Sequence, residues 1–246
     1  MRPILFYMGP VPIFAYGIFI LLGTIALFAV ALYLGRQDKL SFDQLLPIAF
    51  GVGAGGVVGA KLTHVLVEPD KATEFLNFFG LFLPGTPGNI IGLMIGGYVG
   101  GFLVRTSVGL PANGKYYAPA IAIASAIWRI GCTLAGCCHG KETDFPIAIF
   151  LENAQRHPTM IYEGLFNLFM VFVLWRIYPR FSRHDDSLLF FYFVCYAFFR
   201  FWLEFIRVYP PVLWGLTGIQ YLCLGILFIL GIWWSKQSDL NRWWRR

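Results

Sequence analysis

The stretch that decides the fold runs from Pro3 to Gly35 and reads PILFYMGPVPIFAYGIFILLGTIALFAVALYLG. It contains no charged residue and no His, and it is flanked by Arg2 and Arg36. A helix needs about 20 predominantly apolar residues to cross the hydrocarbon core of a bilayer. The stretch therefore predicts a transmembrane helix within residues 11–34. It lacks the small-residue cleavage site of a signal peptide, so we expect an uncleaved first span.

The rest of the chain has the same apolar character. Of its 246 residues, 58% are hydrophobic, 18% are aromatic and only 13% are charged, whereas a soluble domain has about 25% charged residues. This composition excludes secreted, cytosolic and disordered classes of protein. It predicts an all-α polytopic membrane protein in which residues 1–246 form a single transmembrane domain. Six further apolar runs predict helices at residues 46–67, 89–104, 117–137, 159–177, 187–207 and 214–234.

The placement of Lys and Arg predicts the orientation. With seven spans and a cytoplasmic C-terminus, eleven basic residues lie on the cytoplasmic side and four on the outer side, as the positive-inside rule requires. The eleven are Arg36, Lys39, Arg105, Lys115, Arg176, Arg180, Arg183, Lys236, Arg242, Arg245 and Arg246, and the four are Arg2, Lys71, Lys141 and Arg156. We therefore expect a periplasmic N-terminus, a cytoplasmic C-terminus and periplasmic segments at about 68–88 and 138–158. The apolar part of the first segment, 75–88, should lie flat at the outer interface. Topology thus accounts for the net charge of +6, and no nucleic-acid partner is expected.

Charged residues inside the apolar runs mark a candidate site. Arg129 lies within the span 117–137, where an Arg costs about 2.5–3.5 kcal/mol on insertion scales unless it meets water, an anion or a partner. Arg200, Glu204 and Arg207 are spaced i, i+4 and i+7, which places them on one helical face. Two interpretations stay open. The charges form an internal salt bridge that holds the bundle together, or they line a cavity that binds an anion, most naturally a lipid phosphate.

A second group of polar residues lies where the outer loop re-enters the membrane. Arg156, His157, Tyr162 and Glu163 follow one another within the stretch RHPTMIYEG. A lone His or Tyr at an interface is most often an anchor. Here several polar groups are expected at one depth, close to Arg129 on the preceding span, and this favours a functional role.

Three cysteines and a histidine, Cys132, Cys137, Cys138 and His139, suggest two further chemistries. The spacing C-x4-C-C-H is not that of a zinc site. Neighbouring residues on a helix also point about 100° apart, which hinders shared ligation by Cys137 and Cys138. We therefore expect no metal site and no cofactor. A thiol-redox role that faces an oxidising compartment is the alternative.

Several motifs, spread over nearly the whole chain, resemble those of a known family. They are PVPIFAYGIFILLG (10–23), WRIGCTLAGCCHGKETDFPIAI (128–149), RHPTMIYEGLFN (156–167) and FFRFWLEFIR (198–207). In this order they resemble the prolipoprotein diacylglyceryl transferases of bacterial inner membranes. The resemblance implies seven spans with the N-terminus outside. It also implies transfer of the diacylglyceryl group from phosphatidylglycerol to the lipobox cysteine thiol of a prolipoprotein, with release of glycerol phosphate. The implied partners are phosphatidylglycerol, the prolipoprotein signal peptide and the lipid bilayer.

The resemblance also implies roles for particular residues. Arg129 matches the signature arginine that holds the phospholipid headgroup, and Arg200 matches one member of an essential charged pair, so both are expected to be catalytic. The expected substrate-binding residues are Tyr16, Arg129, Gly131, Tyr162, Glu163, Glu204 and Arg207.

The chain departs from the family pattern in its proton-abstracting half. The family has a catalytic His at the start of the third span, and this chain has Ile there, in GNIIGLMIG (88–96). Cys132, Ala135 and Cys137 occupy signature positions for Asn and Glu, and Lys141 replaces the final Arg. We therefore take His139 as the substitute catalytic base, with His64 as the weaker candidate. A family member with another acceptor, a non-catalytic lipid-binding protein and a thiol-disulfide membrane enzyme are the alternative functions.

Overall fold

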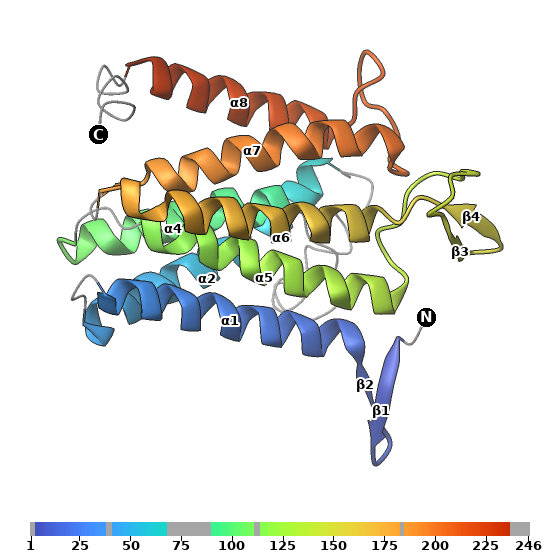
Figure 1. Ribbon diagram of the computed structural model, residues 1–246, viewed down its shortest axis with the longest axis horizontal. Helices are drawn as coiled ribbons and strands as arrows, with labels where there is room; N and C mark the ends of the chain where they lie inside the picture. The colour runs from blue at the N-terminus through green and yellow to red at the C-terminus, as the bar shows by residue number, and fades with distance from the viewer. Residues whose placement is uncertain (1–2, 38–40, 68–89, 111–113, 183–184, 237–246) are drawn as a thin grey trace.

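The computed structural model describes residues 3–37, 41–67, 90–110, 114–182 and 185–236 (Figure 1). Within these ranges, seven helices are long and apolar enough to cross a membrane. They are α1 (Ala15–Gln37), α2 (Phe42–Val67), α4 (Ile90–Ser107), α5 (Gly114–Ala135), α6 (Thr159–Ile177), α7 (Ser187–Leu203) and α8 (Gly218–Lys236). Large apolar side chains such as Phe169, Phe172 and Phe228 are exposed on their outer faces, as contact with lipid requires. The prediction of an all-α, seven-span protein is confirmed. The expected interfacial segment at 75–88 lies outside the described residues.

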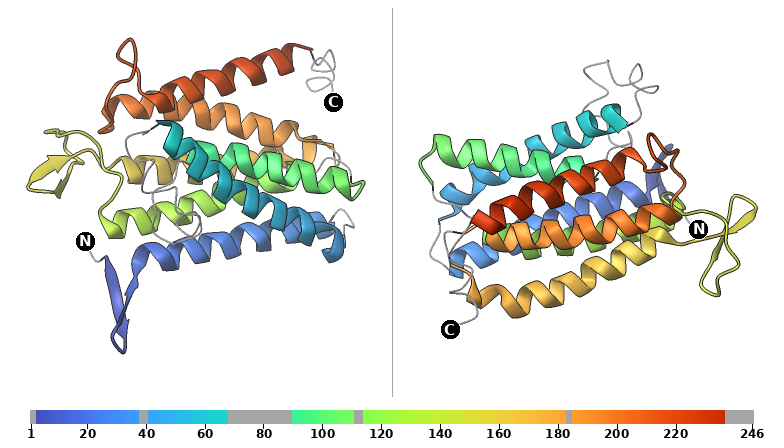
Figure 2. Two further views of the ribbon diagram at one scale, coloured as in Figure 1. Left: turned by 180° about the vertical axis from the view of Figure 1, so that it is seen from behind. Right: turned by 90° about the horizontal axis from the view of Figure 1, so that it is seen from above.

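Two β-hairpins were not predicted. β1 (Ile4–Met8) pairs with β2 (Val11–Phe14), and β3 (Ile149–Leu151) pairs with β4 (Ala154–Arg156), both antiparallel. Residues 11–14 were expected to begin the first span, and this was wrong. Gly9 turns the chain with a φ of +63° and residues 11–14 pair with β1, so the helix begins only at Ala15. Figures 1 and 2 place both hairpins at one end of the bundle, called here the hairpin end.

Helix α5 lies at the centre of the bundle and packs against α1, α6 and α7. Its buried surface is built largely from small residues, because Ala118, Ala120, Ala122 and Ala124 are all fully buried. Small side chains allow the neighbouring helices to approach closely. As a result, Arg129 near the end of α5 lies inside the protein at the hairpin end.

Helices α2 and α4 pack through their glycines. A Cβ atom at Gly55 would lie 2.3 Å from the carbonyl oxygen of Gly96, and one at Gly96 would lie 2.2 Å from that of Gly55. No side chain fits at such distances. The contact is therefore the small-residue packing that brings membrane helices together.

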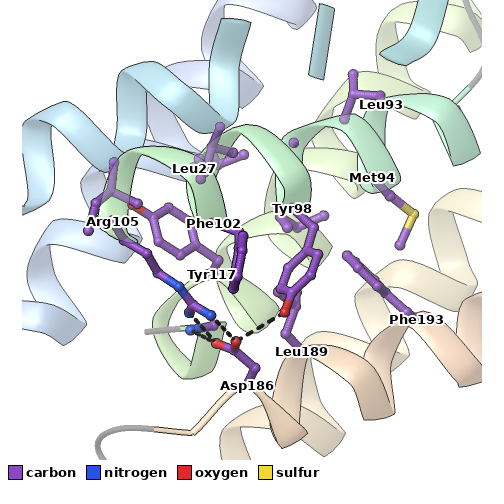
Figure 3. Close-up of a pocket in the computed structure, with 16 residues that line it drawn as sticks. Leu27, Leu93, Met94, Tyr98, Phe102, Arg105, Tyr117, Asp186, Leu189 and Phe193 are labelled. Atoms are coloured by element: carbon purple, nitrogen blue, oxygen red, sulfur yellow. Dashed lines mark hydrogen bonds and ion pairs between the residues drawn. The ribbon is translucent and has the colours of Figure 1, made fainter. Parts of the chain in front are cut away.

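At the opposite end of the bundle, a mostly apolar pocket ends in a buried ion pair (Figure 3). Nη1 and Nη2 of Arg105 donate to Oδ1 and Oδ2 of Asp186 at 2.9 and 2.7 Å. Asp186 also accepts hydrogen bonds from the Gly114 amide and the Tyr98 hydroxyl. This pair joins α4, α5 and α7 and is electrically neutral. We interpret it as a structural salt bridge.

Candidate active site

Five charged residues converge at the hairpin end and form what we call the arginine cluster. They are Arg129 on α5, Glu163 on α6, Arg200 on α7, Glu204 at the start of the short 3-10 helix η4 (Glu204–Ile206), and Arg207 directly after it. All five are buried, and the two carboxylates are almost inaccessible. Although the predicted helix 187–207 ends at Leu203, η4 and the residue after it keep Glu204 and Arg207 close to Arg200, and the packing of α5 and α6 adds the other two residues.

The cluster is held by alternating charges. Arg129 Nη2 donates to Glu163 Oε1, and Arg200 Nη1 lies 2.5 Å from Glu204 Oε2. Arg207 bridges the two pairs, with Nη1 3.7 Å from Glu163 Oε2 and Nε 4.0 Å from Glu204 Oε2. The expected internal salt bridges therefore exist.

Salt bridges do not account for the whole cluster, because three guanidinium groups face two carboxylates. Nε of Arg200, and Nε and Nη1 of Arg207, are buried without a hydrogen-bond acceptor among the residues that the structure describes, whereas Nη1 of Arg200 faces Glu204 Oε2. A buried donor without a partner costs about 1–3 kcal/mol. The Arg105–Asp186 pair shows neither a charge excess nor such orphaned donors. The arginine cluster thus has both the charge and the free donors to bind an oxyanion.

Several neutral residues position the two carboxylates, and the sequence analysis missed them. The Tyr196 hydroxyl donates to Glu163 Oε1 at 2.6 Å, and Asn167 Nδ2 donates to the Glu163 carbonyl oxygen at 2.8 Å. The Thr217 hydroxyl donates to Glu204 Oε1 at 3.2 Å. Tyr196 lies four residues before Arg200, one helical turn away on the same face of α7. The i, i+4 spacing that groups Arg200 with Glu204 therefore also points to Tyr196.

Backbone hydrogen bonds hold the loop after α5 beside the arginine cluster. The Gly140 amide donates to the His157 carbonyl at 2.8 Å, and the Lys141 amide donates to the Ile206 carbonyl at 2.7 Å. Gly140 is required there, because a Cβ atom would lie 2.5 Å from the Ile206 oxygen. The loop therefore joins the start of α6 to the end of η4, next to Arg207.

The structure does not bring two of the expected site residues into the cluster. Nε2 of His139 lies 3.4 Å from Glu152 Oε1, and its Nδ1 faces the Gly140 carbonyl at 3.3 Å. The Tyr162 hydroxyl lies 3.3 Å from Nδ1 of His157. These contacts belong to the outer loop, on the side facing the β3–β4 hairpin.

Two other expected residues lie where α1 meets α5. A Cβ atom at Gly131 would lie 2.8 Å from Phe19 Cβ and 3.4 Å from Tyr16 Cα, so Gly131 permits this helix contact. Tyr16 is partly exposed and lies close enough to Arg129 to interact with its charge. His64 is buried in α2, which packs chiefly on α4.

The cysteines do not lie as the sequence analysis assumed. Helix α5 ends at Ala135, and Gly136 and Cys138 both have left-handed φ angles, of +72° and +64°. Cys137 and Cys138 are therefore not successive helical residues, and the chain folds back toward Cys132. The three sulfur atoms lie within 4.8 Å of one another. Hydrogen bonds with the two other thiols, and then the nearby guanidinium groups, hold the pKa of Cys138 well below its usual range.

Comparison with known proteins agrees with this architecture. Residues 3–235 match the family described as prolipoprotein diacylglyceryl transferase. A phosphatidylglycerol–prolipoprotein diacylglyceryl transferase of Clostridium tetani is 30% identical over 85% of this chain and 87% of its own length. A protein of the same name from Coxiella burnetii is 29% identical over 95% of each chain, and one from Clostridium perfringens is 28% identical over 92% of each. Because the match spans nearly all of the chain and includes all seven helices, this protein belongs to the prolipoprotein diacylglyceryl transferase family.

Proposed function

We propose that this protein transfers the diacylglyceryl group of phosphatidylglycerol to a prolipoprotein, and that the arginine cluster binds the phosphate of the lipid headgroup. One observation carries the assignment of the site. Three nitrogen atoms without an acceptor, Nε of Arg200 and Nε and Nη1 of Arg207, are buried in a cluster with one excess positive charge. A phosphodiester supplies the missing negative charge and the acceptor oxygens, in a geometry that guanidinium groups match. Membership of the family does not favour the alternative functions.

The chemistry follows from this placement. The acceptor is the lipobox cysteine thiol of the prolipoprotein signal peptide. Its sulfur attacks the glyceryl carbon that bears the phosphate, so that an S–C bond forms, the C–O bond breaks, and glycerol phosphate leaves with the bonding electrons. Negative charge grows on the phosphate oxygens as they leave. Arg129, Arg200 and Arg207 stabilise that charge, and they do so strongly because the site is buried.

The thiol proton must go to a base, and we propose His139 for this role. The His lies directly after Cys138, whose thiol is within reach of the charges of Arg129 and Arg207. Glu152, 3.4 Å from Nε2, is placed to pair with the imidazolium that forms. His139 must release one of its present contacts before it can accept the proton. We therefore expect the outer loop to move during the reaction.

We also assign Tyr16, Gly131 and Tyr162 to substrate binding, since Tyr16 and Gly131 lie where α1 meets α5 and Tyr162 contacts His157 of the outer loop. We place the multi-pass protein in the bacterial inner membrane with the hairpin end facing the periplasm. In this orientation the cluster lies at the depth of the outer-leaflet headgroups.

A reconstituted assay tests the function. Purified protein in vesicles that contain phosphatidylglycerol is mixed with a synthetic lipobox peptide. We expect the peptide to gain the mass of one diacylglyceryl group for each glycerol phosphate released. The matched control is a peptide with Ser in place of the lipobox Cys, which should gain nothing. Release of glycerol phosphate without modification of the peptide would show that the acceptor is a different molecule.

A further inference from the structure

The thiols of Cys132, Cys137 and Cys138 form a compact group that the transferase reaction does not use. Their sulfur atoms lie within 4.8 Å of one another. A metal ion in the plane of three sulfur atoms, about 2.3 Å from each, would hold them about 4.0 Å apart. The side chains therefore need to close by less than about 1 Å, which rotation of the two half-buried cysteines of the loop can supply.

We propose that Cys132, Cys137 and Cys138 form a binding site for one thiophilic metal ion, namely Cu(I). Soft thiolate ligands select Cu(I) and Zn(II) over the harder divalent cations. Zn(II) is almost always four-coordinate in protein sites, and no fourth His, Cys or carboxylate joins the three thiols within the part of the chain that the structure describes. Cu(I) is satisfied by three sulfur atoms in a plane.

The electrostatic surroundings suit this ion. Cu(I) held by thiolates carries a net negative charge, which needs positive charge nearby. Nη1 of Arg129 lies 3.9 Å from Cys132 Sγ, and Arg207 lies close enough to Cys138 to interact with it. Arg129 and Arg207 both belong to the arginine cluster, which already has one excess positive charge. The arginine cluster therefore offsets the charge of the metal–thiolate group.

The backbone also prepares the site. The Thr159 hydroxyl on α6 donates to the Cys138 carbonyl, and the Cys137 amide donates to the Cys132 carbonyl at 3.2 Å. These bonds hold the loop over the end of α5 independently of the thiols. The sequence disfavoured a metal because adjacent cysteines on a helix diverge. That reason does not apply here, since the helix has ended before Cys137.

Metal titration tests the proposal without reference to lipid transfer. Reduced, purified protein in detergent is titrated anaerobically with Cu(I) in competition with a coloured Cu(I) chelator. We expect one Cu(I) per chain and an ultraviolet thiolate-to-copper absorption band. Cys137→Ser and Cys138→Ser should each weaken Cu(I) binding by at least about 100-fold, because they remove a ligand rather than a neighbour of one. The matched control is Cys195→Ser on α7, which changes a thiol outside the group and should leave the affinity unchanged.

Three further measurements make the outcome decisive. Thermal denaturation should show that the Cys137→Ser and Cys138→Ser proteins remain folded, since both side chains are only half-buried. A parallel titration with Zn(II) should show weaker binding, and preferential binding of Zn(II) would overturn the assignment to Cu(I). Equal Cu(I) affinity in the wild type and in the two loop variants would overturn the site itself. Mass spectrometry of the reduced protein before titration should find no disulfide among the three cysteines, and a disulfide that resists reduction would also overturn the site.

Discussion

Replacement of Arg200 by Lys separates phosphate binding from simple charge pairing. Nε of Arg200 is buried without an acceptor within the described structure, and Nη1, which lies 2.5 Å from Glu204 Oε2, has a second hydrogen to donate. If both bind the phosphate in the transition state, each charge-assisted bond contributes about 1.5–3 kcal/mol. Loss of both in Arg200→Ala should then lower kcat/KM by about 10²–10⁴-fold. Arg200→Lys keeps the charge beside Glu204 but loses the planar fork, so we expect a loss of at least about tenfold.

The control is the same substitution at the other end of the bundle. Arg105→Lys also puts an ammonium group beside a buried carboxylate, but Arg105 already gives both of its forked nitrogens to Asp186. It should lower the thermal stability of the protein while leaving kcat/KM nearly unchanged. The assay measures glycerol phosphate release from phosphatidylglycerol vesicles with a lipobox peptide, at several concentrations of each substrate.

Two results would refute this reasoning. If Arg200→Lys turns over as fast as the wild type, the fork of Arg200 does not contact the reacting phosphate. If Arg105→Lys loses as much activity as Arg200→Lys, the loss reports on the stability of the bundle rather than on the site. Arg200→Ala alone is less informative, because it leaves Glu204 buried without its partner, which is strongly destabilising.

Four further predictions follow from the structure. A reporter fused after Arg246 should read cytoplasmic and one inserted near Glu152 periplasmic, and both reporters on one side would contradict the seven-span topology. Gly96→Val should lower the denaturation temperature in detergent, because even its Cβ atom would lie 2.2 Å from a carbonyl oxygen of α2, and such overpacking costs about 1–3 kcal/mol. Tyr196→Phe removes a 2.6 Å hydrogen bond to a buried carboxylate, worth about 1.5–3 kcal/mol, and should lower kcat/KM in the peptide assay without loss of membrane insertion. His139→Ala should lower turnover by about 10²–10⁴-fold, and a variant with normal turnover would exclude His139 as the base.

The seven spans could be predicted from sequence because the requirement for about 20 apolar residues is strong and local. The closeness of Arg200 and Glu204 was equally accessible, because residues i and i+4 lie on one helical face. Arg207 stays close although the α-helix ends at Leu203, which periodicity does not predict. The pairing of Arg129 with Glu163 depends instead on how α5 and α6 pack, which spacing along the chain does not encode.

The errors of the sequence analysis lie where the backbone leaves regular structure. The divergence expected for Cys137 and Cys138 assumed a helix through residue 137. The chain instead takes left-handed conformations at Gly136 and at Cys138, and only the first of these is signalled by its residue type. The second strand of the β1–β2 hairpin was predicted as part of the first span, because its residues are as apolar as those of the helix that follows.

The two buried ionic groups of this protein show that a buried arginine does not by itself mark a functional site. At one end, Arg105 and Asp186 satisfy each other, and the arrangement needs no further partner. At the hairpin end, Arg200 and Arg207 retain buried donors after pairing with both available carboxylates.

Folding alone gains nothing from such orphaned donors, because each costs free energy in the unliganded protein. Their presence is explained if an anionic ligand supplies the missing acceptors, and a membrane offers that anion at the depth of its headgroups. In the proposed function, the excess of guanidinium groups over carboxylates is the feature that connects the fold to lipid chemistry.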